Sequence, residues 1–72
     1  MSQTFRLTAT VIPDGDWFLA RCGEVEVASQ GRSIEEALAN LREALELYYE
    51  DEPAPEELPE PIVAPIEVRL SA

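Results

Sequence analysis

The sequence predicts an α+β fold of the order β-β-β-α-β, a four-stranded mixed sheet with one helix on one face. Three observations predict this fold. Apolar and polar residues alternate with a period of two in several short segments, as in strands with one buried face. One stretch, after Ser33, has the period of an amphipathic helix. Prolines and acidic residues dominate between that stretch and the last alternating segment.

The first half of the chain predicts a hairpin followed by a third strand. The first strand covers residues 4–12, and the second, residues 17–22, returns antiparallel after a Pro-Asp-Gly-Asp turn. Proline presets φ and glycine accepts a positive φ in such a turn. A third strand at 25–28 leads to Gly31, which is expected to end it. The side chains expected beneath the helix include Phe5, Leu7, Phe18, Ala20, Cys22, Val25, Val27 and Ile66.

The helix is expected to start near Ile34. Ser33 and Glu36 have the spacing of a capping box, in which each side chain accepts a hydrogen bond from a backbone N–H that the first turn leaves free. The apolar residues that follow recur at three and four positions, so one stripe of a four-turn helix must pack on the sheet. This stripe consists of Ile34, Ala37, Leu38, Leu41, Ala44, Leu45 and Tyr48.

Residues 51–61 form a predicted acidic, proline-rich linker, because prolines end a helix and favour stiff, extended chain. Residues 62–70 alternate again and predict a last strand, which Pro65 confines to a sheet edge or a bulge. A right-handed crossover through the helix sets this strand parallel to the first, in the spatial order 3-2-1-4. The whole chain, residues 1–72, is then one domain.

Length and composition favour a small protein that self-associates. A chain of 72 residues buries only about 60% of its unfolded surface, so its stability is marginal without a partner subunit. Cys22 is the single cysteine and there is no histidine, which excludes an intramolecular disulfide and leaves too few ligands for zinc. Neither a signal peptide nor a membrane span is recognisable, so we expect a cytoplasmic protein.

The charge is strongly negative, with 15 acidic and 5 basic residues and a net charge of −10. Such a surface repels phosphate backbones and attracts cationic proteins, so we expect no direct nucleic-acid binding by this chain. That the acidity only keeps a small protein soluble is an open alternative. The acidic excess lies in residues 43–60. Its predicted partner contacts are Glu43, Glu46, Glu50, Asp51 and Glu52.

Trp17 and Leu19 form a second predicted contact. Both fall on the sheet face that the single helix leaves open, where a large aromatic side chain beside leucine makes an apolar patch for self-association or for a partner. The alternative is that these are scattered surface side chains, which the linker or a tail covers.

No enzymatic signature is present, and we expect no cofactor and no metal. Asp14 and Asp16 flank Gly15 in the predicted turn, where solvated carboxylates are ordinary. Cys22 has no histidine to act as a base and falls on the core-facing register. A remnant nuclease that binds a divalent metal at Asp14 or Asp16 is the less favoured alternative.

The run Trp-Phe-Leu-Ala-Arg-Cys at residues 17–22, and above all Ser-Gln-Gly-Arg-Ser-Ile-Glu-Glu-Ala at 29–37, resemble the HicB-like antitoxin domain of bacterial and archaeal toxin-antitoxin modules. The resemblance covers roughly residues 5–50. It implies a partial ribonuclease-H-like fold and a homodimer or tetramer. It also implies neutralisation of a small, basic HicA-type toxin that cleaves messenger RNA.

The chain departs from this family in one respect. Many members carry a C-terminal DNA-binding module after the last strand, whereas this sequence ends at Ala72, so direct repression of an operon is not expected. A homo-oligomeric structural or regulatory binding module without a toxin is therefore the alternative function.

Overall fold

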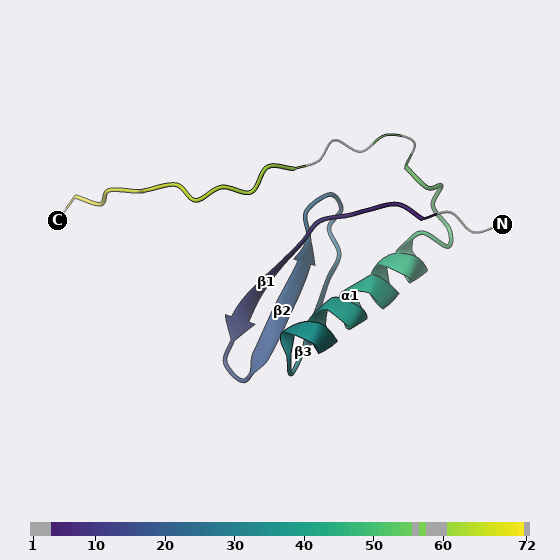
Figure 1. Cartoon of the computed structure of the whole chain (residues 1–72), viewed down its shortest axis with the longest axis horizontal. Helices are drawn as coiled ribbons and strands as arrows, with labels where there is room; N and C mark the ends of the chain where they lie inside the picture. The colour runs from purple at the N-terminus through teal and green to yellow at the C-terminus, as the bar shows by residue number, and fades with distance from the viewer. Residues whose placement is uncertain (1–3, 56, 58–60, 72) are drawn as a thin grey trace.

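Three antiparallel strands and one helix make up the folded part of the chain. We describe a computed structural model, which covers residues 4–55, 57 and 61–71. Strands β1 (Ala9–Asp14), β2 (Trp17–Cys22) and β3 (Ala28–Gly31) form one sheet in the order β1-β2-β3. Helix α1 (Ile34–Tyr48) follows β3 and packs on one face of this sheet, which leaves the other face open (Figure 1). The predicted α+β class and its single helix are confirmed.

In the hairpin of β1 and β2, the second strand has the predicted bounds, whereas the first strand begins and ends later than predicted. Six residue pairs join the two strands, from Ala9 opposite Cys22 to Asp14 opposite Trp17. Gly15 has φ +63°, which suits the first position of a two-residue hairpin loop. The first strand begins later than predicted because the Thr8 N–H donates to the Glu24 side chain instead of to the backbone of β2. The Thr8 carbonyl accepts a 2.9 Å hydrogen bond from the Gly23 N–H.

The predicted third strand at residues 25–28 is wrong in position. The Val27 N–H donates to the Val25 carbonyl at 2.9 Å, a local turn that diverts this donor from the ladder, although the Val27 carbonyl still accepts from the Cys22 N–H of β2. Pairing with β2 starts only at Ala28, opposite Arg21, and extends to Gly31. The side chains of Val25 and Val27 still pack against the core, as the alternation predicts.

The helix begins at Ile34 as predicted, and the Ser33 half of the predicted capping box is formed. Ser33 has extended backbone angles, and its Oγ accepts a 3.0 Å hydrogen bond from the Glu36 N–H. Glu36 Oε1 accepts from the Arg32 N–H at 3.2 Å, one residue before the N-cap. The Asn40 side chain donates to the Gln30 carbonyl at 2.8 Å and ties the helix to β3. Local hydrogen bonds therefore set the junction between strand and helix.

The core between sheet and helix is small. Among the described residues, four buried apolar side chains form its centre, namely Ala20, Cys22, Ala37 and Leu41. Six half-buried side chains surround them, namely Leu7, Val11, Phe18, Val25, Val27 and Leu45. The predicted apolar stripe of the helix is confirmed at its centre, whereas Ile34, Leu38 and Tyr48 remain exposed. The sheet and helix thus bury only part of the apolar surface that the sequence provides.

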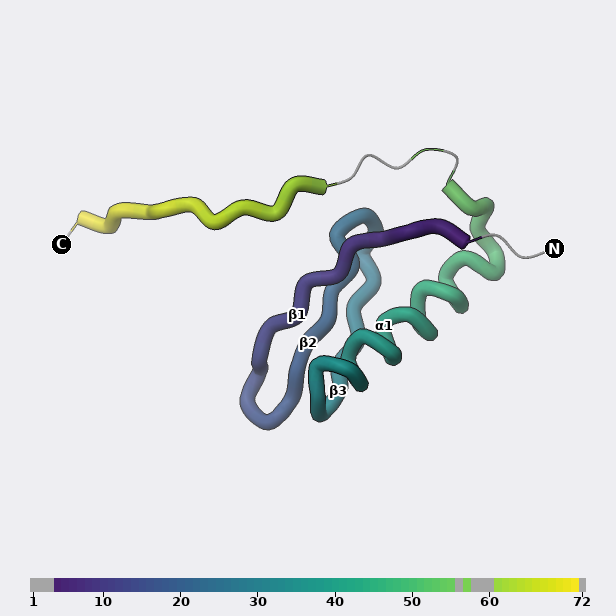
Figure 2. The backbone as a smooth tube through the Cα atoms, viewed as in Figure 1, coloured from purple at the N-terminus to yellow at the C-terminus, as the bar shows by residue number. Residues whose placement is uncertain are grey.

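The predicted fourth strand is absent from the sheet. Residues 61–71 are extended and exposed, and they run away from the sheet and the helix (Figures 1 and 2). Ile66, predicted to lie beneath the helix, is 84% exposed. The described sheet is therefore antiparallel and three-stranded, not mixed with the order 3-2-1-4. Alternation identifies a segment that suits a sheet, but a strand also needs an adjacent backbone edge. In the predicted linker, residues 56 and 58–60 lie outside the described part of the chain.

Candidate interaction surfaces

The predicted acidic contact lies at the end of helix α1. Glu43 and Glu46 are exposed on helix α1, whereas Leu41 is buried, and Glu46 also lines the space between the helix and residues 4–9. All of these acids are exposed, and no basic residue lies in the last turn of the helix. We call the whole group the acidic end: Glu43, Glu46, Glu50, Asp51 and Glu52.

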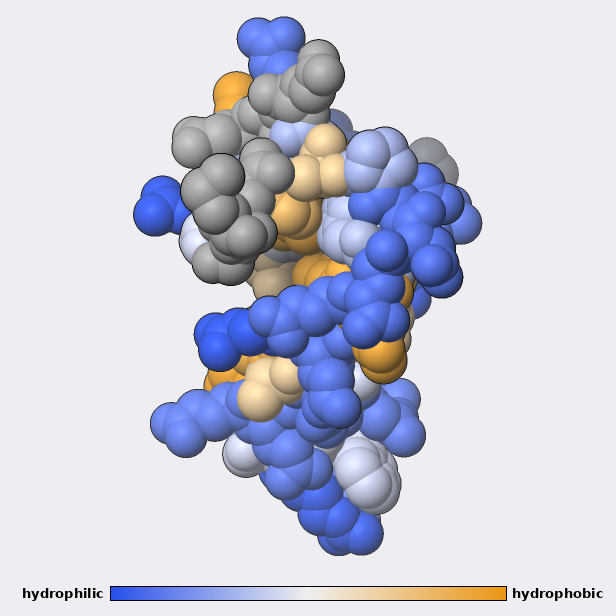
Figure 3. Space-filling model, turned by 90° about the vertical axis from the view of Figure 1, so that its right-hand side faces the viewer, coloured by the Kyte–Doolittle hydropathy of each residue, from blue (hydrophilic) through white to orange (hydrophobic). Residues whose placement is uncertain are grey.

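The acidic end is electrostatically unfavourable for the isolated chain. The carbonyl groups that finish a helix carry partial negative charge, and each acid close to them costs about 0.3–1 kcal/mol. The helix start is the opposite case, since Glu35 and Glu36 lie in the first turn, where negative charge stabilises. Figure 3, which views the side on which the helix finishes, shows hydrophilic side chains with apolar surface between them. The acidic end therefore combines negative charge with neighbouring apolar surface.

The predicted contact at Trp17 and Leu19 is less exposed than expected. Both lie on the open sheet face but are half-buried. The guanidinium carbon of Arg32 lies 4.5 Å from the centre of the Trp17 ring, a cation–π contact that covers part of it. Ile12 pairs with Leu19 and is 55% exposed. The more accessible apolar side chain on this face is thus Ile12, the last residue of the predicted first strand, which falls on the same face as Thr8 and Thr10 by alternation.

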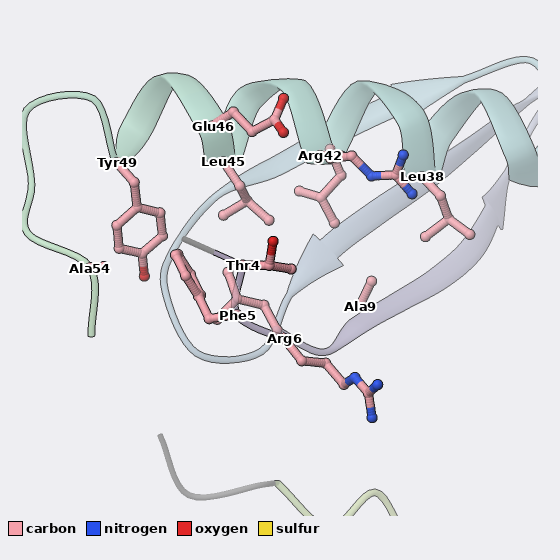
Figure 4. Close-up of a pocket in the computed structure, with 12 residues that line it drawn as sticks. Thr4, Phe5, Arg6, Ala9, Leu38, Arg42, Leu45, Glu46, Tyr49 and Ala54 are labelled. Atoms are coloured by element: carbon pink, nitrogen blue, oxygen red, sulfur yellow. The ribbon is translucent and has the colours of Figure 1, made fainter. Parts of the chain in front are cut away.

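A groove that sequence reasoning missed lies between helix α1 and the chain leading into β1. It has a volume of about 670 Å³. Leu38 and Leu45 point into it from the helix, and Phe5 lies opposite them (Figure 4). The Phe5 and Tyr49 rings meet edge to face with centroids 5.1 Å apart. Burial in this contact, with smaller effects of nearby Tyr48, Cys22, Glu24 and Glu52, raises the pKa of the Tyr49 phenol.

Glu24 connects the bend before β3 to the start of the chain. Its Oε1 accepts a 2.9 Å hydrogen bond from the Thr8 N–H. The Cys22 thiol lies 3.5 Å from the same oxygen. The hydrogen bond from Thr8 lowers the pKa of Glu24 and outweighs the opposing effect of partial burial. Cys22 itself is free and buried, so this carboxylate holds the backbone and packs against a core residue.

Asp14 and Asp16 are the two carboxylates of the less favoured metal-binding alternative. Asp14 and Asp16 are exposed at the hairpin turn. Within residues 4–55, 57 and 61–71, no three side chains of His, Cys, Asp or Glu are placed to hold a metal ion. Helix α1, the only helix among these residues, is too short and too polar to cross a membrane.

The fold, the acidic end, the open sheet face and the groove are the basis for any functional conclusion. No protein-family model, no curated protein and no solved structure matches the chain. Its resemblance to HicB-like domains therefore stays a prediction from the sequence. The chain is an α+β protein in which a three-stranded antiparallel sheet is followed by one helix packed against it.

Proposed function

We propose that this chain is an antitoxin-like binding protein of the HicB type, which self-associates and neutralises a small, basic, messenger-RNA-cleaving toxin of the HicA type. The observation that supports this proposal most is the acidic end, where five exposed acids follow one another without a base. Residues 29–37 resemble HicB-like domains, and this resemblance implies that the partner is a HicA-type toxin.

Electrostatics gives the proposed mechanism. A protein that binds RNA needs a cationic surface, and the acidic end competes with phosphate for that surface. Because the net charge of the chain is −10, long-range attraction accelerates encounter with a basic partner. Binding also neutralises acids that oppose the helix dipole, so part of the cost of their placement is recovered in the complex.

The test is coexpression of the chain with any small basic protein that a neighbouring gene encodes, followed by copurification and an RNA-cleavage assay. The proposal expects a complex that no longer cleaves RNA. In the variant Glu50→Gln/Asp51→Asn/Glu52→Gln, association should slow and its salt dependence should flatten. The matched control, Asp14→Asn/Asp16→Asn/Glu35→Gln, removes the same number of charges near the helix start and should associate faster than that variant. Failure of the unmodified chain to bind or to protect RNA would refute the proposal.

A second candidate is a homo-oligomeric structural or regulatory binding module without a toxin. The exposed apolar residues of the C-terminal segment favour it, because they suit contact with another copy of the chain. A stable dimer in sedimentation, together with no copurifying basic protein, would select this candidate over the first.

A further inference from the structure

Among the described residues, the C-terminal segment, residues 61–71, carries the most strongly exposed apolar side chains. Ile62 is 93% exposed and Leu70 is 86% exposed. Val63, Ile66 and Val68 are exposed as well. Soluble monomers seldom expose contiguous apolar surface of this kind. Every second residue of this segment is apolar, which is the pattern of a strand, yet the segment contacts neither the sheet nor the helix. It therefore lacks a neighbouring strand with which to pair.

The chain is more extended and exposes more surface than a compact monomer of its length. Its Cα radius of gyration is 14.8 Å, whereas a compact domain of this length has roughly 11 Å. Its accessible surface is 6541 Å², about 2,000 Å² more than a compact monomer of this size exposes. A stable protein–protein interface buries about 1,200–2,000 Å² in total. The excess surface is therefore sufficient for a dimer.

We infer that residues 61–71 of one copy add as a strand to the free edge of β1 in a second copy and lie in the groove beneath its helix α1. Two copies exchange their segments reciprocally, which gives a closed dimer with twofold symmetry. This inference rests on the self-association within the proposed function but needs no toxin.

The free edge of β1 is a suitable acceptor. In the order β1-β2-β3, β1 pairs only with β2, so its other edge is open. Among the described residues, no backbone–backbone hydrogen bond joins residues 4–7 to another segment. The nine residues 62–70 span about 30 Å as a strand, whereas the six residues of β1 span about 20 Å, so the added strand would also run along the residues that precede β1. An added strand would thus supply the hydrogen bonds that this edge lacks.

The groove is a suitable acceptor for side chains. Leu38, Leu45 and Phe5 line it, and Leu38 is exposed in the single chain (Figure 4). One face of the segment is apolar at every second position, through Ile62, Ala64, Ile66, Val68 and Leu70. Backbone N–H groups alternate between the two edges of a strand in the same way. Pairing through the edge of Ile66 and Val68 turns Pro65, which has no N–H, to the other edge, so the proline costs no ladder hydrogen bond.

Sedimentation velocity of the full chain, without any partner, tests the inference. The chain should sediment as a dimer. The variant Ile66→Arg/Val68→Arg should be monomeric, with a dissociation constant raised at least about 100-fold. This variant has a net charge of −8 instead of −10, so its copies repel each other less. The change in charge alone would therefore favour the dimer and cannot explain a loss of dimerisation. The matched control Val63→Arg/Glu67→Gln also reaches −8 but changes the other face, and it should remain dimeric. Circular dichroism confirms that each variant is folded.

Mixing two variants tests exchange between chains directly. Leu38→Arg blocks the groove but keeps the segment, and it should be monomeric alone. Mixed with Ile66→Arg/Val68→Arg, it should form a dimer, because one intact segment meets one intact groove. A monomeric unmodified chain, a dimer that survives Ile66→Arg/Val68→Arg, or no association on mixing would each overturn the inference.

Salt separates this inference from the proposed function. Two chains of like charge should dimerise more tightly as salt rises, whereas a basic partner should bind more weakly. If the sedimentation experiments give the contrary results, only the exchange of C-terminal segments is refuted. Failure of copurification with the basic protein concerns the toxin alone.

Discussion

Replacement of Gly31 by alanine is the sharpest test of the strand-to-helix junction. Gly31 is buried at the end of β3, just before the helix cap. A Cβ at this position would lie 2.5 Å from the Ala37 backbone N and 2.8 Å from the Glu36 carbonyl carbon. Ordinary contacts of a Cβ begin near 3.4 Å, so the first helical turn would have to move by almost 1 Å. Backbone atoms cannot rotate away as a flexible side chain can.

Overpacking costs about 1–3 kcal/mol, and a backbone clash belongs near the upper end, so we expect Gly31→Ala to destabilise by about 3 kcal/mol. The whole domain has about 4–11 kcal/mol of stability at its length. A loss of 3 kcal/mol lowers the midpoint of thermal unfolding by roughly 12–24 °C in a domain of this size.

The assay is urea unfolding followed by circular dichroism at one fixed protein concentration, because self-association makes apparent stability depend on concentration. Gly23→Ala is the matched control. Its added Cβ would meet nothing closer than Thr8 O at 3.8 Å, so the free energy of unfolding should stay within about 1 kcal/mol of the unmodified chain. Equal urea midpoints for Gly31→Ala and Gly23→Ala would show that β3 and α1 do not approach each other this closely.

Three further predictions concern hydrogen bonds and titration. Ser33→Ala should reduce the free energy of unfolding by about 1 kcal/mol through loss of the N-cap, and Ser33→Asp, which restores an acceptor, should recover most of it in urea titrations. The pKa of Glu24 is lowered from its unfolded value of 4.5, so its contribution is complete above pH 4.5 and is lost as pH falls through the lower folded pKa. Unfolding curves should therefore show the unmodified chain losing about 1 kcal/mol more than Glu24→Gln on acidification, and parallel losses would contradict the Thr8 contact. The raised pKa of Tyr49 should appear in an ultraviolet titration as a phenol that ionises above the usual value of 10.0 and disappears in Tyr49→Phe; a signal retained in that variant would assign it to Tyr48.

Local signals in the sequence were sufficient for the helix and the hairpin. Ser33 and the recurrence of apolar residues predicted a helix from Ile34, because caps and periodicity depend on neighbours within one or two turns. The second strand and its turn were predicted for the same reason. The acidic end could also be read from composition, since exposed acids need no packing partner.

The tertiary structure decided every feature that depends on a distant backbone. Val25 and Val27 pack against the core as their alternation predicts, yet the ladder starts at Ala28 because the Val27 N–H donates to the Val25 carbonyl instead of to β2. Contact with Arg32 half-covers Trp17, which no pattern in the sequence predicts.

The C-terminal segment shows most clearly what the sequence alone does not determine. Alternation in residues 62–70 determined that they suit a sheet, whereas the structure leaves them outside the sheet of their own chain. Periodicity is a property of the segment itself, but pairing also depends on which free edge lies within reach. The sequence by itself therefore determined the elements and their apolar faces, and only the tertiary structure decided which backbone edges and grooves remain open, because these depend on contacts between segments far apart in the chain.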